Sequence, residues 1–165
     1  MRRRSRVGRT PALLLVPAAV AMLTSGCGAP MVGIAGIGVD QAGNPVGYLR
    51  VCDSDKHLDG ATVHPDGSDD DYGSWKSNKA VTGVATWPLA GPAPGWTTET
   101  TPKPRTAGVL YDLYGWTADN SASTAEVAFT AADLAGLQPG QVRYAPGDSD
   151  KYTVTSEEEF RTGPC

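Results

Sequence analysis

Short runs of β-branched and aromatic residues, separated by Gly, Pro and Asp, recur along most of the chain. The first run, 31–39, is rich in Ile, Val and Gly, and turn-forming residues at 40–45 separate it from a second run at 46–52. Because Asp, Gly, Asn and Pro favour tight turns, these segments predict an antiparallel hairpin.

Further strands are predicted downstream. The stretch 107–116 is apolar on both faces apart from Asp112, as expected of a central strand. In 124–130, Val127 and Phe129 alternate with polar residues, which is typical of a half-buried strand. The other predicted strands are 61–64, 81–87, 141–145 and 151–155; loops are predicted at 65–73 and 91–106, and a short capped helical turn at 130–134.

About seven or eight short strands, without a long segment of helical period, predict an all-β fold. We expect a single immunoglobulin-like β-sandwich, with a barrel as the second choice. The segment Leu137–Gly140 followed by Tyr144 resembles the tyrosine corner of fibronectin type III and immunoglobulin-like domains. This resemblance covers about ten residues, and the tyrosine falls one position later than in fibronectin domains.

The start of the chain has the order of an export signal. Five arginines without an acid are followed by an apolar run at 12–23 and by small, neutral residues at 24–26. This order predicts a cleaved signal peptide over residues 1–26, because the apolar run is too short to cross about 30 Å of hydrocarbon. A retained membrane anchor is the alternative.

The segment Leu23–Cys27 resembles the lipobox of bacterial lipoproteins, with Thr24 where the motif usually has an aliphatic residue. The resemblance implies cleavage before Cys27 and a lipid on that cysteine. Residues 27–30 would then be the lipidated cysteine and a short spacer, and residues 31–165 the folded domain. In the alternative, plain secretion, cleavage falls within 24–26 and Cys27 stays a thiol.

Three cysteines are an odd number for an exported chain. A lipid on Cys27 leaves Cys52 and Cys165, which we expect to form a disulfide. The alternatives are a buried free thiol at Cys52 and pairing between molecules through Cys165.

Segments 46–52, 113–121, 129–134 and 141–144 also resemble small lipoproteins of high-GC Gram-positive (actinobacterial) bacteria. This resemblance implies a protein of the cell membrane, lipid-anchored on the extracellular face. It supplies no catalytic residue and no ligand.

The charge balance bears on the choice of partner. The chain has a net charge of -4, and without residues 1–26 the charge is about -9, because five arginines leave and all 18 acids stay. An acidic surface repels phosphate backbones, so nucleic acid is not expected as a partner.

The sequence lacks the motifs of common catalytic and metal sites. It contains no Gly-x-Ser-x-Gly nucleophile elbow and no glycine-rich phosphate loop leading into a helix. The two histidines, His57 and His64, have neighbouring aspartates, but the spacing fits neither a helix-borne zinc site nor an EF-hand. We therefore expect no cofactor, no metal and no catalytic residue; a Cys52–His57 nucleophile pair would require a free thiol.

Tryptophans give the best indication of binding. Trp87 and Trp116 end predicted strands and are expected in the core. Trp75 and Trp96 follow or lie in loops, where exposed aromatic rings contact sugars or peptides. The alternative is that both rings fold back over the end of the domain.

These observations favour a non-enzymatic binding or envelope-accessory module. Its expected partners are the membrane, through the lipid on Cys27, and a glycan or protein ligand. The alternative function is a cell-envelope glycan hydrolase that uses loop carboxylates, with Asp119 and Glu126 as the candidate pair.

Overall fold

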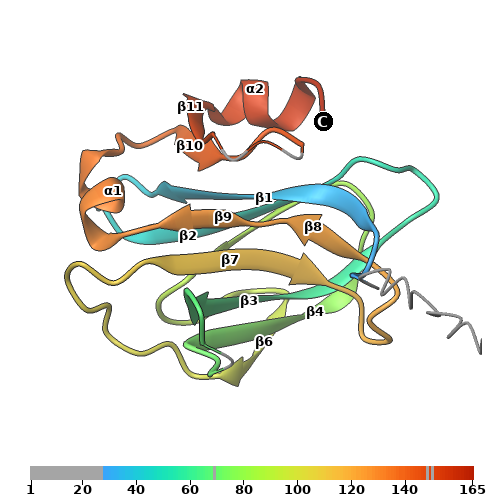
Figure 1. Ribbon diagram of the computed structural model, residues 1–165, viewed down its shortest axis with the longest axis horizontal. Helices are drawn as coiled ribbons and strands as arrows, with labels where there is room; N and C mark the ends of the chain where they lie inside the picture. The colour runs from blue at the N-terminus through green and yellow to red at the C-terminus, as the bar shows by residue number, and fades with distance from the viewer. Residues whose placement is uncertain (1–27, 69, 148, 150) are drawn as a thin grey trace, which may run out of the picture.

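The computed structural model describes residues 28–165 except 69, 148 and 150, and nearly all regular structure in them is β (Figure 1). The strands are β1 (Met31–Val39), β2 (Pro45–Val51), β3 (Leu58–Pro65), β4 (Gly73–Val81), β5 (Val84–Pro88), β6 (Trp96–Thr100), β7 (Tyr111–Trp116), β8 (Ser123–Ala125), β9 (Val127–Phe129), β10 (Gln141–Tyr144) and β11 (Thr153–Ser156). The helices are α1 (Ala131–Gly136) and α2 (Glu157–Thr162).

The predicted signal peptide, residues 1–26, and Cys27 lie outside the described residues. Neither helix in the described part of the chain has the length and apolar character to cross a bilayer.

All described strands belong to one hydrogen-bonded sheet, which is nearly closed and barrel-like. The strand order is β11-β10-β1-β8-β7-β3-β4-β6; β2 pairs with β1 and β5, and β9 pairs with β7. The prediction of an all-β fold is confirmed. One nearly closed sheet, in place of two facing sheets, corresponds to the barrel named as second choice and not to the immunoglobulin-like sandwich.

Strand β1 pairs with three other strands of this sheet. It pairs with β2 along most of its length, runs parallel to β8 near its start and is antiparallel to β10 near its end. Two glycines permit these close approaches: a Cβ atom on Gly33 would collide with the carbonyl oxygen of Arg50, and one on Gly36 would lie 2.7 Å from the Val142 side chain. The glycine-rich pattern that predicts a strand at 31–39 therefore also lets three strands share it.

The larger core fills the interior of the barrel and is rich in aromatic rings. Trp75, Trp87 and Trp96 form a stack, with ring centroids 6.0 and 4.6 Å apart along it. Strand β7 adds Tyr111 and Leu113, which are 2% and 0% exposed. Because side chains alternate along a strand, the even-numbered residues of β7 lie on the outer face of the sheet.

A second, smaller core lies between β1, β2 and the C-terminal segment. Figure 1 shows β10, β11 and α2 on the β1 side of the barrel, away from β3, β4 and β6. Phe160 of α2 is 1% exposed and packs edge-on against Tyr48 and Tyr144, at centroid distances of 5.8 and 5.4 Å. Tyr144, which the sequence placed in a tyrosine corner, thus helps to seat α2.

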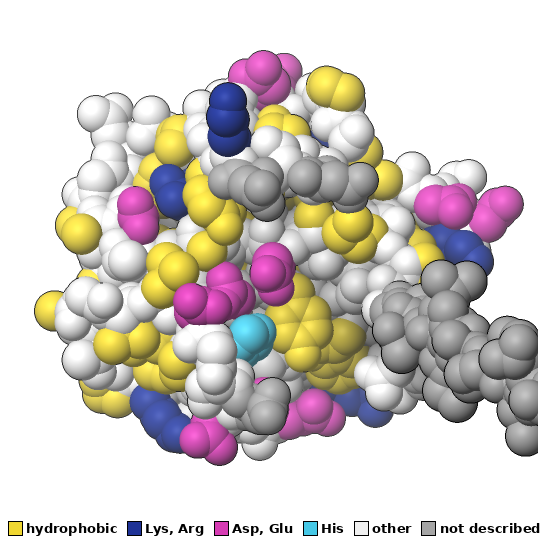
Figure 2. Space-filling model, viewed as in Figure 1, with side chains coloured by type: hydrophobic (Ala, Val, Ile, Leu, Met, Phe, Trp, Pro, Cys, Tyr) yellow, Lys and Arg dark blue, Asp and Glu magenta, His cyan; other side chains and the backbone are white. Residues whose placement is uncertain are grey.

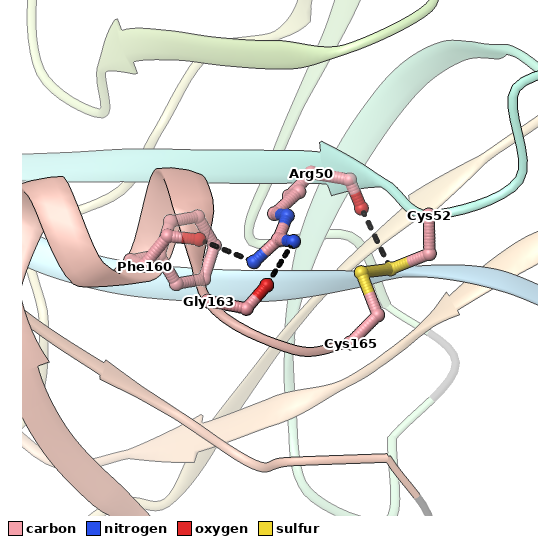
Figure 3. Close-up of a disulfide and its surroundings, with 5 residues drawn as sticks. All are labelled: Arg50, Cys52, Phe160, Gly163 and Cys165. Atoms are coloured by element: carbon pink, nitrogen blue, oxygen red, sulfur yellow. Dashed lines mark hydrogen bonds between the residues drawn. A yellow bond between two sulfur atoms is a disulfide. The ribbon is translucent and has the colours of Figure 1, made fainter.

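The predicted disulfide between Cys52 and Cys165 is confirmed. Its Cα atoms are 5.9 Å apart, and it joins the residue after β2 to the last residue of the chain (Figure 3). Arg50 lies beside it, where its guanidinium donates one hydrogen bond of 2.8 Å to the carbonyl oxygen of Phe160 and another to that of Gly163. The C-terminal segment is therefore held by apolar packing, by charge-assisted hydrogen bonds and by a covalent bond.

Candidate ligand-binding face

The outer side of β3 and β7 carries a set of polar and aromatic side chains that we call the outer face: Thr62, His64, Asp112, Tyr114 and Trp116. The antiparallel register places His64 opposite Asp112, Thr62 opposite Tyr114, and Gly60 opposite Trp116. Figure 2 shows this side of the molecule, with a histidine side chain between acidic groups and a hydrophobic surface.

Glycine at position 60 seats the indole of Trp116 flat on the sheet. A Cβ atom on Gly60 would collide with this ring, so the missing side chain makes room for it. The indole Nε1 donates a 2.9 Å hydrogen bond to Oγ1 of Thr62, which also lies 3.2 Å from Oγ of Ser74. Trp116 is therefore half-buried on the outer face, and its predicted place in the core is wrong.

Two shallow, open hollows adjoin on the outer face. The larger, of about 300 Å³, is lined by Thr62, Asp71, Ser74, Glu99, Tyr114, Trp116, Thr117, Ala118 and Asn120. The smaller, of about 160 Å³, is lined by His64, Ser68, Asp71 and Tyr114. Because Asp71 and Tyr114 line both, the hollows form one surface in which aromatic rings are bordered by carboxylates.

Asp112 is the most deeply buried charged residue of this face. It is only 6% exposed, and no described residue donates a hydrogen bond to its carboxylate. Burial is the main cause that raises the pKa of Asp112; Glu126 and Asp66 add to the rise, and His64 opposes it. Nδ1 of His64 lies 3.1 Å from the carbonyl oxygen of Pro65, so this nitrogen is oriented toward the backbone and not toward the carboxylate.

Tyr114 has a similar electrostatic setting. Burial raises the pKa of its hydroxyl, and Asp71 raises it further. The ring packs edge-on against His64, with centroids 5.7 Å apart. Tyr114 therefore stays neutral at physiological pH and presents a fixed, partly exposed ring.

The tryptophans singled out in the sequence lie elsewhere. Trp75 is 1% exposed and belongs to the interior stack, and Trp96 is half-buried at the end of the same stack, against Trp87. Both rings fold back onto the domain. The aromatic rings of the outer face are instead those of Tyr114 and Trp116. These residues and Asp112 occupy alternate positions of β7, so the sequence indicates a shared face once Tyr111 and Leu113 are assigned to the interior.

Three of the residues considered for catalysis, Cys52, His57 and Asp119, are engaged in other contacts. Cys52 is in the disulfide, and Nε2 of the exposed His57 lies 3.6 Å from Oδ1 of the partly buried Asp59. The side chain of Asp119 accepts a 3.0 Å hydrogen bond from the backbone N–H of Ser121, and hydrogen bonds to Ser121 are the main cause that lowers its pKa to about 2. A carboxyl group that stays ionised is unsuited to be the general acid of a glycosidase.

The described residues contain no group of three His, Cys, Asp or Glu side chains arranged to hold a metal ion. No family model, curated protein or solved structure matches this chain.

Proposed function

We propose that this chain is a lipid-anchored extracellular binding module whose outer face holds an envelope glycan without catalysing a reaction. The observation that carries the proposal is the pair of partly exposed rings, Tyr114 and Trp116, on an open groove bordered by carboxylates and an amide. Flat aromatic rings stack on the apolar faces of sugars, and carboxylate and amide groups accept and donate hydrogen bonds to sugar hydroxyls.

The rigidity of the groove supports this proposal. The indole of Trp116 is fixed by its seat on Gly60 and by its hydrogen bond to Thr62, so little side-chain entropy is lost when a ligand stacks on it. The two adjoining hollows are open and not enclosed, which suits a polymer chain that passes over the surface better than a small molecule held in a pocket.

The position of the face is compatible with an anchor at Cys27. Met31, at the start of β1, pairs with Ser123, and Ser123 pairs with Trp116, so the groove lies beside the end of the domain at which β1 begins. Only three residues, 28–30, separate Cys27 from β1. A bound glycan would therefore be held close to the membrane surface.

Binding is tested by co-sedimentation of residues 28–165 with insoluble cell-wall polysaccharide. The proposal expects wild-type protein in the pellet and a loss of about fivefold to thirtyfold in affinity for Trp116→Ala, because stacking of one ring contributes about 1–2 kcal/mol. Tyr152→Ala is the matched control, since Tyr152 is an exposed ring (39%) outside the outer face. Equal binding by wild type and Trp116→Ala would refute this site.

The supernatants of the co-sedimentation assay also test the alternative function, a glycan hydrolase. Release of reducing sugar ends by wild-type protein would contradict a module that only binds.

The anchor is tested separately by detergent phase partition of the full chain expressed in a bacterial host. We expect the wild type in the detergent phase and Cys27→Ala in the aqueous phase, because the two or more acyl chains of a lipidated cysteine hold stably and none remains in the variant. Cys27→Ala protein that stays in the detergent phase would refute lipidation at this residue.

A further inference from the structure

Among the residues that the structure describes, none donates a hydrogen bond to the Asp112 carboxylate or forms an ion pair with it. Buried charges in folded proteins are usually paired or hydrogen-bonded, because removal of a charge from water without compensation is unfavourable. Asp112 is 94% buried as a residue, but its carboxylate oxygens are not among the fully buried unpaired atoms of the described residues, so they reach the surface where a group from solvent can contact them.

The surroundings of Asp112 are more acidic than basic. The charged groups that act on it are Glu126, between β8 and β9, Asp66, in the loop after β3, and His64, on β3; no Lys or Arg is among them. Glu126 and Asp66 are exposed, so their charges border the face from two sides. This arrangement attracts a cation that would come from outside the chain.

Tyr114 gives this location a second cation-binding element. It is two residues from Asp112 on the same strand face, about 6.7 Å along β7. Its neutral ring lines both hollows of the outer face. A group seated between the carboxylate and the ring would therefore gain a charge-assisted hydrogen bond and a cation–π contact together.

A protonated amine suits these contacts. An ammonium group carries one charge and three N–H donors, so a single buried carboxylate and one ring can satisfy it, whereas a divalent cation needs several oxygen ligands. The described residues contain no group of three acidic, histidine or cysteine side chains close enough to coordinate a divalent cation.

We infer that the outer face binds a protonated primary amine at Asp112 and Tyr114, so that its glycan ligand contains free, unacetylated amino sugars. The inference rests on the proposed glycan-binding function and specifies the class of sugar.

Two matched ligands test it. Oligomers of glucosamine and of N-acetylglucosamine share the same β-linked backbone and length, but only the former carries ammonium groups. We expect isothermal titration of residues 28–165 near pH 6.5 and 0.15 M salt to show at least tenfold tighter binding of the glucosamine oligomer, because a hydrogen bond to a charged group contributes at least that factor.

Variants separate this site from general attraction of an acidic protein for a polycation. Asp112→Asn keeps the size of the side chain and removes one charge, and it should abolish the preference for the glucosamine oligomer. Glu158→Gln, at an exposed position of α2, removes the same charge and should retain the preference. Glu126 is exposed, so replacing it with glutamine leaves the core packing unchanged. Glu126→Gln should weaken binding of the glucosamine oligomer about twofold to threefold.

Equal binding of the two oligomers by wild-type protein would overturn the amine site, as would a preference retained by Asp112→Asn or lost by Glu158→Gln. If neither oligomer binds while wall polysaccharide still sediments the wild type and not Trp116→Ala, the amine site is wrong and the glycan-binding function stands. If neither oligomer binds and wall polysaccharide does not sediment the wild type, the glycan-binding function is refuted as well. If Asp112→Asn fails to fold, as judged by circular dichroism, the Glu126→Gln and Glu158→Gln pair decides the outcome.

Discussion

Replacing Cys52 and Cys165 together with serine removes the disulfide but leaves the other contacts of the C-terminal segment in place. Both cysteines are exposed, so serine hydroxyls remain solvated there. Phe160 stays in the smaller core, and Arg50 keeps its acceptors on α2 and Gly163. We therefore expect the variant to fold, and its loss of stability to arise chiefly in the unfolded state.

The magnitude follows from the separation of 113 residues between the two cysteines. In the chain-entropy model, opening a loop of that length lowers the free energy of unfolding by about 4.8 kcal/mol at 25 °C. Measured effects are often smaller, so we expect a loss of about 3–5 kcal/mol. That is a large part of the stability of a single domain, which is typically about 5–15 kcal/mol.

Urea denaturation followed by tryptophan fluorescence and by circular dichroism measures this loss. The m-value should also rise in the double variant, because an unfolded chain without the cross-link exposes more surface. Wild-type protein reduced with dithiothreitol should reproduce the variant. A loss below about 1 kcal/mol with an unchanged m-value would refute the entropic argument.

Three further predictions concern local contacts. Phe160→Ala should lower the free energy of unfolding by about 3–5 kcal/mol in urea, because it removes the largest fully buried side chain of the smaller core; a loss under 1 kcal/mol would contradict that packing. Burial, and after it Glu157, raise the pKa of Tyr48 to about 12 from 10, so the folded state keeps this proton longer than the unfolded state. The resulting stability is complete below pH 10 and is lost as the pH rises through 12, and Tyr48→Phe should flatten the stability profile between these values. Thr130→Ala removes the side chain that accepts a hydrogen bond from the backbone N–H of Asp133 and should cost about 1 kcal/mol in urea, whereas Thr130→Ser should cost little; equal losses would argue against the cap.

Much of the fold is visible in the local pattern of the sequence. The hairpin expected at 31–39 and 46–52 corresponds to β1 and β2, and the capped turn at 130–134 corresponds to α1. These predictions succeed because turn residues and a capping box act over a few positions. The disulfide could be predicted because the expected lipid on Cys27 leaves Cys52 and Cys165 as one pair among the three cysteines.

Other elements depend on tertiary contacts that local patterns do not encode. The segment 91–106, expected to be a loop, contains β6, whose Thr-rich sequence becomes a strand through pairing with β4. The expected strand 81–87 is divided, because Val81 ends β4 and β5 begins at Val84. The last residues form α2 although the helix is only six residues long, since Phe160 is buried and Ser156 caps its start.

The candidate site was harder to predict than the fold. Loops are usually exposed, which favours ligand contact by Trp75 and Trp96, but the barrel interior has room for both rings. Trp116 was expected inside because it ends an apolar strand, yet Gly60 on the neighbouring strand provides a seat for it outside. A glycine opposite a tryptophan becomes informative only when the strand register is known.

The pairing of Met31, Ser123 and Trp116 also determines how the domain would carry a mechanical load. Tension between a ligand on β7 and an anchor before β1 would pass through β8, which runs parallel to β1. Force directed along β1 loads its hydrogen bonds to β2, β8 and β10 in shear, so several must break at once. An edge strand would instead peel away one bond at a time. Cys52, whose backbone N–H donates a 2.8 Å hydrogen bond to the carbonyl oxygen of Val32, places the covalent cross-link at the point where such a pull would enter the sheet.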